Sequence, residues 1–82
     1  MKYPVYSIRD TKVGFNPEFH VFENEVASVR GFKYMLQGAN LLGKFPEDFE
    51  WYQVAEFDSE SGAMNGIIPP KFIVAGGSII EK

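Results

Sequence analysis

Residues 49–57, FEWYQVAEF, are the stretch on which the fold of this chain depends. The run is dense in aromatic and apolar side chains, which predicts a β-strand. Tyr52 and Val54 would share one face of this strand, but Phe57 stands three positions beyond Val54 and would fall on the other face. We expect a β-bulge near Ala55–Glu56, because one extra residue returns Phe57 to the face of Val54.

The segment that follows this strand predicts a hairpin. Residues 58–62, DSESG, are small and polar, and they predict a loop in which Gly62 takes a positive φ angle. Residues 63–68 are expected to return as the partner strand. Residues 71–76, KFIVAG, either add a further short strand or lie over the sheet.

The first half of the chain predicts one more strand and a long connection. Residues 3–9 carry aromatic or apolar side chains on both faces near their start, which is typical of an interior strand. Pro4 is compatible only with the beginning of a strand or with an edge. Residues 13–22 form the connection, and residues 19–22, FHVF, are expected as a short strand within it.

Residues 24–39 predict the main helix. Asn24 suits the N-cap, and Gly38 and Asn40 supply stop signals. An apolar stripe at helical spacing comprises Val29, Phe32, Leu36 and Ala39, flanked by Val26 and Met35. Gly31 costs about 1 kcal/mol relative to Ala in mid-helix. This cost predicts the close approach of another backbone, either the sheet or a second subunit.

These elements predict an α+β fold, with the order β-α-β-β and an optional further strand, in which one helix packs on a mostly antiparallel sheet. The 82 residues make a single domain, 1–82. The chain has no cysteine, so aromatic packing and self-association are the routes left for stabilising so small a domain. Eight Phe, four Tyr and one Trp exceed what this core can enclose, so we expect some rings at a subunit interface, with a dimer favoured.

Charge is distributed unevenly along the chain. The net charge of −3 divides into +1 over residues 1–41 and −4 over residues 42–82. This balance argues against a strong duplex-DNA binder and leaves the first half for any nucleic-acid contact. No run approaches the length of a membrane span, and the start of the chain lacks the features of a signal peptide, which predicts a cytoplasmic protein.

Side chains suited to catalysis or metal binding are scarce. His20 is the only histidine and cysteine is absent, so we expect no enzyme activity, no metal and no cofactor. The segments DSESG, 58–62, and AGGS, 75–78, are predicted to be turns rather than a calcium loop and a phosphate loop.

A few cations beside stacking rings can hold single-stranded nucleic acid. The candidate cations are Arg9, Lys12, Arg30 and Lys33. The candidate rings are Tyr3, Tyr6, Phe19, Tyr34, Trp51 and Tyr52. Tyr34 is the ring most expected outside the core, because it lies off the apolar stripe. We expect the Asp10 side chain to fix the turn after the first strand, so that the four cations share one surface. The alternative for Arg9 and Asp10 is a structural ion pair or turn.

Several short motifs follow one another along nearly the whole chain. They are Val5-Tyr6-Ser7 with Asp10 and Lys12, Phe15, Arg30-x-Phe32, Pro46-x-Asp48-Phe49, Val54-x-x-Phe57-Asp58 and Gly62. Through them the chain resembles the small nonstructural proteins of gokushovirus-type microviruses (Microviridae), the icosahedral phages with single-stranded DNA. The departures from the family pattern are Glu18 between Pro17 and Phe19, Ala55 in place of a common Gly, and Gly43-Lys44 in place of a His-containing lead-in.

The resemblance implies a non-virion factor in the host cytoplasm that binds single-stranded DNA or assists the switch from replication to packaging. It implies motif roles for Arg9, Lys12 and Arg30, and structural positions for Asp10, Phe32, Pro46, Asp48, Phe57, Asp58 and Gly62. A second hypothesis is a protein-interaction module that contacts a replication, prohead or host protein without binding DNA. A third is an acidic mimic of DNA, built from the carboxylates of residues 47–60.

Overall fold

The computed structural model describes residues 1–38 and 41–80 of the chain. The longer elements are β1 (Lys2–Asp10), α1 (Glu25–Leu36), β4 (Phe49–Asp58) and β5 (Met64–Ala75). The shorter elements are β2 (Gly14–Phe15), β3 (His20–Val21), α2 (Leu41–Lys44), η1 (Pro46–Asp48) and α3 (Gly76–Ile79). The expected strands at 3–9 and 49–57 and the expected helix are therefore present, and the predicted α+β class is confirmed.

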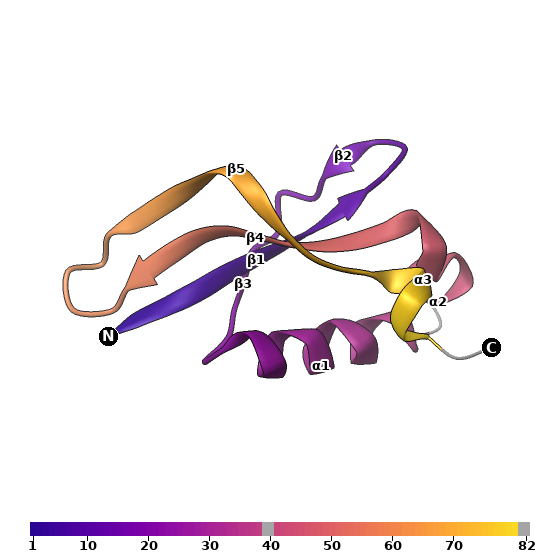
Figure 1. Cartoon of the computed structure of the whole chain (residues 1–82), viewed down its shortest axis with the longest axis horizontal. Coiled ribbons are helices and arrows are strands. Elements are labelled where there is room, and N and C mark those ends of the chain that lie inside the picture. Colours follow the sequence, from indigo (N-terminus) through magenta and orange to yellow (C-terminus); the bar gives the residue numbers. More distant parts are fainter. Residues whose placement is uncertain (39–40, 81–82) are drawn as a thin grey trace.

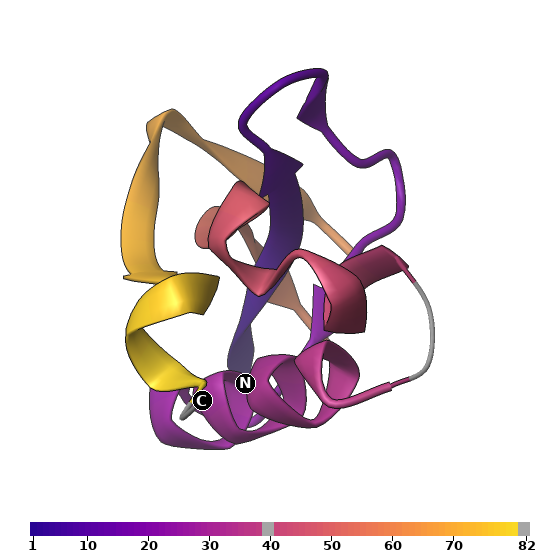
Figure 2. The ribbon, with the colours of Figure 1, turned by 90° about the vertical axis from the view of Figure 1, so that its right-hand side faces the viewer.

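The strands form one antiparallel sheet in the order β2-β1-β4-β5, and β3 also pairs with β1. β1 is interior, as predicted. α1 lies along one face of the sheet, and β1, β4 and β5 extend past its amino-terminal end (Figure 1). The short helices α2, η1 and α3 close the other end of the domain, above the carboxyl end of α1 (Figure 2).

The predicted β-bulge in β4 exists, but it lies one residue earlier than expected. Val5 of β1 pairs with Ala55 and Tyr6 pairs with Gln53, so Val54 is the extra residue. Tyr52 pairs with Ser7 on one side of the bulge, and Phe57 pairs with Tyr3 on the other. Because paired residues share a face and alternate residues of β1 share a face, Phe57 lies on the same face as Tyr52.

The return from the hairpin is one long strand rather than two. β5 runs from Met64 to Ala75, although its pairing with β4 is interrupted between Gly66 and Lys71. Pro69 and Pro70 fall inside this interruption, and the Ile68–Pro69 peptide is cis. The expected turn at AGGS is wrong, because residues 76–79 form α3.

α1 begins as the sequence predicts and ends earlier. The Asn24 side chain accepts a hydrogen bond from the Ala27 backbone N–H at 2.8 Å. The helix ends at Leu36, with Gln37 as its C-cap; the expected last residue of the stripe, Ala39, and the stop signal Asn40 lie outside the described residues. The buried residues of α1 are Ser28, Phe32 and Leu36, while the expected flank residue Val26 is exposed.

Gly31 admits a close neighbour, as expected, but the neighbour is a side chain. A Cβ built on Gly31 would lie 2.6 Å from Cζ of Phe22. The Phe22 ring in turn packs edge-on against Tyr6 and Trp51. Gly31 therefore makes room for a ring from the segment after β3.

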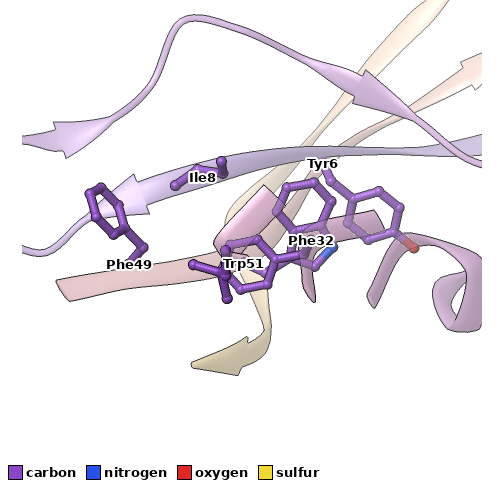
Figure 3. Close-up of a cluster of buried hydrophobic side chains, with 6 residues drawn as sticks. Tyr6, Ile8, Phe32, Phe49 and Trp51 are labelled. Atoms are coloured by element: carbon purple, nitrogen blue, oxygen red, sulfur yellow. The ribbon is translucent and has the colours of Figure 1, made fainter. Parts of the chain in front are cut away.

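The core is organised around Trp51, which is fully buried. Its indole stacks between Tyr6 and Phe32, with ring centroids 5.2 and 4.9 Å away (Figure 3). The indole N–H donates to Ser28 Oγ at 3.1 Å, and Ser28 Oγ–H donates to the Glu25 carbonyl at 2.7 Å. One serine on α1 thus satisfies the buried indole N–H at the centre of the core.

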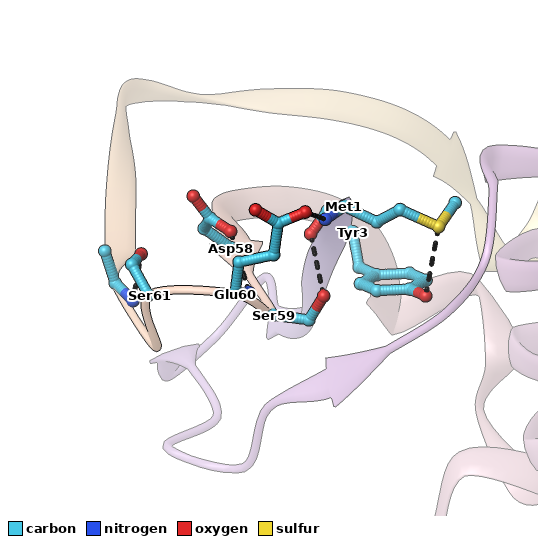
Figure 4. Close-up of polar contacts among 7 residues, drawn as sticks. Met1, Tyr3, Asp58, Ser59, Glu60 and Ser61 are labelled. Atoms are coloured by element: carbon cyan, nitrogen blue, oxygen red, sulfur yellow. Dashed lines mark hydrogen bonds and ion pairs between the residues drawn. The ribbon is translucent and has the colours of Figure 1, made fainter.

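The loop between β4 and β5 is closed by its own hydrogen bonds. Asp58 accepts from the Glu60 N–H through its side chain at 2.9 Å and from the Gly62 N–H through its carbonyl at 2.8 Å. Gly62 has φ +78°, which confirms the predicted positive φ. Ser59 donates to the Met1 carbonyl, joining the loop to the start of β1 (Figure 4). Hydrogen bonding to the Glu60 N–H lowers the pKa of Asp58.

Candidate nucleic-acid interface

The solvent side of α1 brings together three of the predicted nucleic-acid-binding residues, Arg30, Lys33 and Tyr34. Positions three and four apart lie on one helix face, with Cβ atoms about 5–6 Å apart. Phe32 and Leu36 point into the core and Met35 packs at its edge, so Arg30, Lys33 and Tyr34 are left on the solvent side of the helix. All three are exposed, and Tyr34 retains 75% of its surface.

The charges that α1 itself places on this side are of one sign, and the Glu18 carboxylate lies beside Tyr34 at the edge of it. Glu25 is the only carboxylate of the helix, and it faces β5, where it pairs with Lys71 Nζ at 3.6 Å. Within residues 1–38 and 41–80, neither Arg30 nor Lys33 forms an ion pair. We call Arg30, Lys33 and Tyr34 the α1 cation face.

Arg9 lies elsewhere and is already paired. Ile8 of β1 packs in the core beneath α1, so the next residue, Arg9, points to the opposite face of the sheet. There Arg9 Nη1 donates to Glu50 Oε1 at 3.0 Å, and Tyr52 OH donates to the same oxygen at 3.4 Å. The Glu50 contact raises the pKa of Arg9 further. This is the structural ion pair weighed as the alternative.

Lys12 belongs to a junction between the β1–β2 turn and η1. Asp10 Oδ1 accepts from the Lys12 N–H at 2.9 Å, which confirms that Asp10 fixes the turn. Thr11 donates to the Asp48 carbonyl through both its N–H and its hydroxyl, and Lys12 Nζ pairs with Asp48 Oδ2 at 3.3 Å. Residues 10–12 thus anchor the β1–β2 turn to η1.

The expected single patch of four cations is wrong. Arg9 and Lys12 each face a carboxylate, and Arg9 lies on the sheet face opposite α1. A glutamate or aspartate some 40 positions away cannot be assigned to either cation from local sequence alone. Only Arg30 and Lys33 remain as free, neighbouring cations.

The candidate rings divide between core and surface. Tyr6 and Trp51 are buried in the stack with Phe32 and cannot receive a base. Tyr34 and Phe19 are exposed, at 75% and 62%. The other motif positions have structural places: Phe32 in the core, Pro46 buried in η1, Phe57 paired with Tyr3, and Asp58 and Gly62 in the hairpin loop.

Sequence reasoning missed a row of rings on the sheet face opposite α1. Phe15 contacts Tyr52 edge-on at 5.1 Å, and Tyr52 contacts Phe72 in the same way at 5.5 Å. Phe15 and Phe72 are about half exposed. We call this side the open sheet face; its exposed apolar residues are Phe15, Val21, Met64 and Phe72, with Phe19 beside them. The period-two alternation of 49–57 was the available signal for Tyr52, but Phe72 lies after a strand interruption that hides its register.

No helix in the described part of the chain is long and apolar enough to cross a membrane. No group of three or more potential metal ligands comes together in residues 1–38 and 41–80.

Comparison with known proteins gives one match. A family model described as "Phage ORF5 protein" matches residues 3–79. No curated protein and no solved structure matches the chain. The matched segment includes both the α1 cation face and the open sheet face.

Proposed function

The chain belongs to the Phage ORF5 protein family, and on that premise we propose that it binds single-stranded DNA through the α1 cation face. Arg30 and Lys33 contact phosphates and Tyr34 stacks on a base. The protein acts in the host cytoplasm, where such binding assists the switch from DNA replication to packaging. The resemblance to microvirus nonstructural proteins motivates this biological role, and the residues of α1 supply its mechanism.

One observation carries the proposal: two unpaired cations and an exposed ring share a helix face in a chain of net charge −3. Elsewhere the cations of β1 and its turn are matched to carboxylates. A polyanion approaching this protein is therefore attracted to one side of α1 and repelled by the acidic second half.

The binding is expected to be weak and salt-dependent. Two phosphate contacts on a single strand give a slope of log K against log salt of about −1.4 per chain. Raising the salt concentration from about 50 to about 200 mM would weaken binding about sevenfold. This modest charge count suits a factor that associates with a displaced strand and releases it.

Fluorescence anisotropy with a labelled oligothymidylate tests the proposal. Replacing both cations, Arg30→Gln with Lys33→Gln, should abolish the salt dependence and most of the binding. The matched control, Lys2→Gln with Lys12→Gln, removes the same charge from positions that are paired with Glu56 and Asp48, and should leave affinity nearly unchanged.

The ring is tested separately. Tyr34→Ala should weaken binding about 5- to 150-fold, the equivalent of about 1–3 kcal/mol for one stacked base, whereas Tyr34→Phe should retain affinity. Equal losses in the α1 variant and in its Lys2/Lys12 control would refute the assignment to α1. Absence of binding at low salt would favour a protein-interaction module instead.

A further inference from the structure

We propose that the open sheet face is a homodimer interface, in which two copies of this chain pack sheet against sheet and leave α1 of each copy on the outside. The inference does not depend on DNA binding. It starts from the fact that α1 covers only one face of the sheet. The other face is apolar and bears half-exposed rings.

The exposed apolar area on the open sheet face is comparable to the largest patch of a typical monomer, and such patches are often functional. Phe15, Phe19 and Phe72 are 45%, 62% and 49% exposed, which leaves roughly 300 Å² of ring surface in contact with water. Val21 and Met64, at 51% and 53%, extend this area across the same face. Monomeric proteins rarely leave apolar patches of more than a few hundred Å² uncovered, and a standard interface buries about 800 Å² per partner.

The shape of the isolated chain supports the same conclusion. Its accessible surface is 5425 Å², whereas a monomer of this mass is expected to expose about 5000 Å². Its radius of gyration is 12.8 Å, against about 11.7 Å for a compact domain of this length. The chain alone is therefore more open than a finished globular unit.

The charges on the open sheet face favour a second copy of the chain over DNA as its partner. The charged pair on the open sheet face is Arg9 with Glu50, and the two neutralise each other at 3.0 Å. A phosphate chain laid on this face would meet Glu50, and the described residues of this face offer it no free cation. A copy of the same face meets a neutral apolar surface, and self-complementarity of this kind is what a two-fold interface requires.

The open sheet face contains a shallow pocket that could receive a side chain of the second copy. It has a volume of about 230 Å³ and is lined by Val5, Phe19, Val54, Ala55, Met64 and Gly66. Val54 is the bulged residue of β4, and Gly66, where the pairing of β5 is interrupted, has no side chain to cover the pocket. An apolar side chain from the second copy can enter here.

The test is the mass of the protein in solution, measured without DNA by sedimentation velocity and light scattering. The wild-type chain should approach twice its 9.3 kDa as its concentration rises through the micromolar range. Phe72→Lys should remain at 9.3 kDa, because lysine is tolerated on an edge strand but repels itself across a two-fold axis. Val26→Lys, which changes an apolar residue 76% exposed on α1, is the matched control and should dimerise as wild type does.

A second measurement remains informative if Phe72→Lys folds poorly. The chain has three methionines, and Met64 lies on the open sheet face whereas Met35 packs against the core. In protein labelled at the methionine methyl groups, the Met64 resonance should shift with protein concentration and the Met35 resonance should not.

Several outcomes would overturn the proposal. A wild-type chain that remains monomeric throughout refutes it, as does a dimer that Phe72→Lys leaves intact. A monomer whose oligonucleotide binding is lost in Phe72→Lys would assign the face to DNA. Failure of DNA binding with dimerisation retained would refute only the function proposed for α1.

Discussion

Removal of one hydroxyl group from α1 should measurably destabilise the whole domain. Ser28 Oγ is the acceptor for the buried Trp51 indole N–H, at 3.1 Å. Ser28→Ala leaves that donor unsatisfied, at a cost of about 1–3 kcal/mol. Alanine gains about 0.5 kcal/mol of helix propensity, so the free energy of unfolding should fall by a net 0.5–2.5 kcal/mol, roughly. For a domain of this size each kcal/mol lowers the melting temperature by about 4–8 °C.

The assay is urea unfolding followed by far-ultraviolet circular dichroism, carried through a double-mutant cycle with Trp51→Phe. Phenylalanine lacks the indole N–H, so Ser28→Ala should cost less in that background than in the wild type. A Ser28→Ala effect that is equally large with and without the indole would show that the hydrogen bond is not its cause. An effect below about 0.5 kcal/mol in the wild type would refute the reasoning outright.

Three further predictions concern glycines and one carboxylate. Gly31→Ala should lower the free energy of unfolding by about 1–3 kcal/mol in urea titrations because its Cβ meets the Phe22 ring 2.6 Å away, and Phe22→Leu should restore part of the loss. Gly76→Ala should destabilise the domain far more than Gly77→Ala in thermal melts. A Cβ on Gly76 would collide with the Pro46 carbonyl oxygen and would lie 2.9 Å from the Phe49 carbonyl oxygen. A Cβ on Gly77 would have its nearest neighbour 3.3 Å away. Because the pKa of Asp58 is lowered in the folded state, its carboxylate stabilises the fold at pH values above the ordinary aspartate pKa of about 3.9. This stabilisation is lost as the pH falls through the lower pKa of the folded state. Melting curves of Asp58→Asn recorded at a series of pH values should lack this component of acid sensitivity.

The parts of the fold that sequence predicted are those fixed by local chemistry. Asn24 caps α1 because its side chain reaches an N–H three residues away, and Gly62 takes a positive φ because the hairpin loop requires it. The bulge was expected because Phe57 is out of phase, but its position at Val54 depends on pairing with β1. The helix α3 was missed because Gly76 follows a strand directly and is held by packing against the Pro46 carbonyl rather than by helix propensity.

The candidate site was predictable to a similar extent. Arg30, Lys33 and Tyr34 lie on one side of α1 because helical spacing alone brings them there, and the sequence is sufficient to show it. Arg9 and Lys12 were misplaced, because their partners Glu50 and Asp48 are distant in sequence and come close only through the sheet and the η1 turn. Tertiary pairing decides which cations are free, and composition does not reveal it.

The pair Pro69-Pro70 in β5 has a consequence for how the protein behaves at high concentration. β5 is the edge of the described sheet on the side away from β1, and proline has no N–H to offer an incoming strand. A neighbour that tries to extend the sheet sideways meets this gap midway along the strand. Growth of a cross-β fibre is therefore disfavoured at that edge. Association at high concentration is left to closed contacts, which do not add further chains.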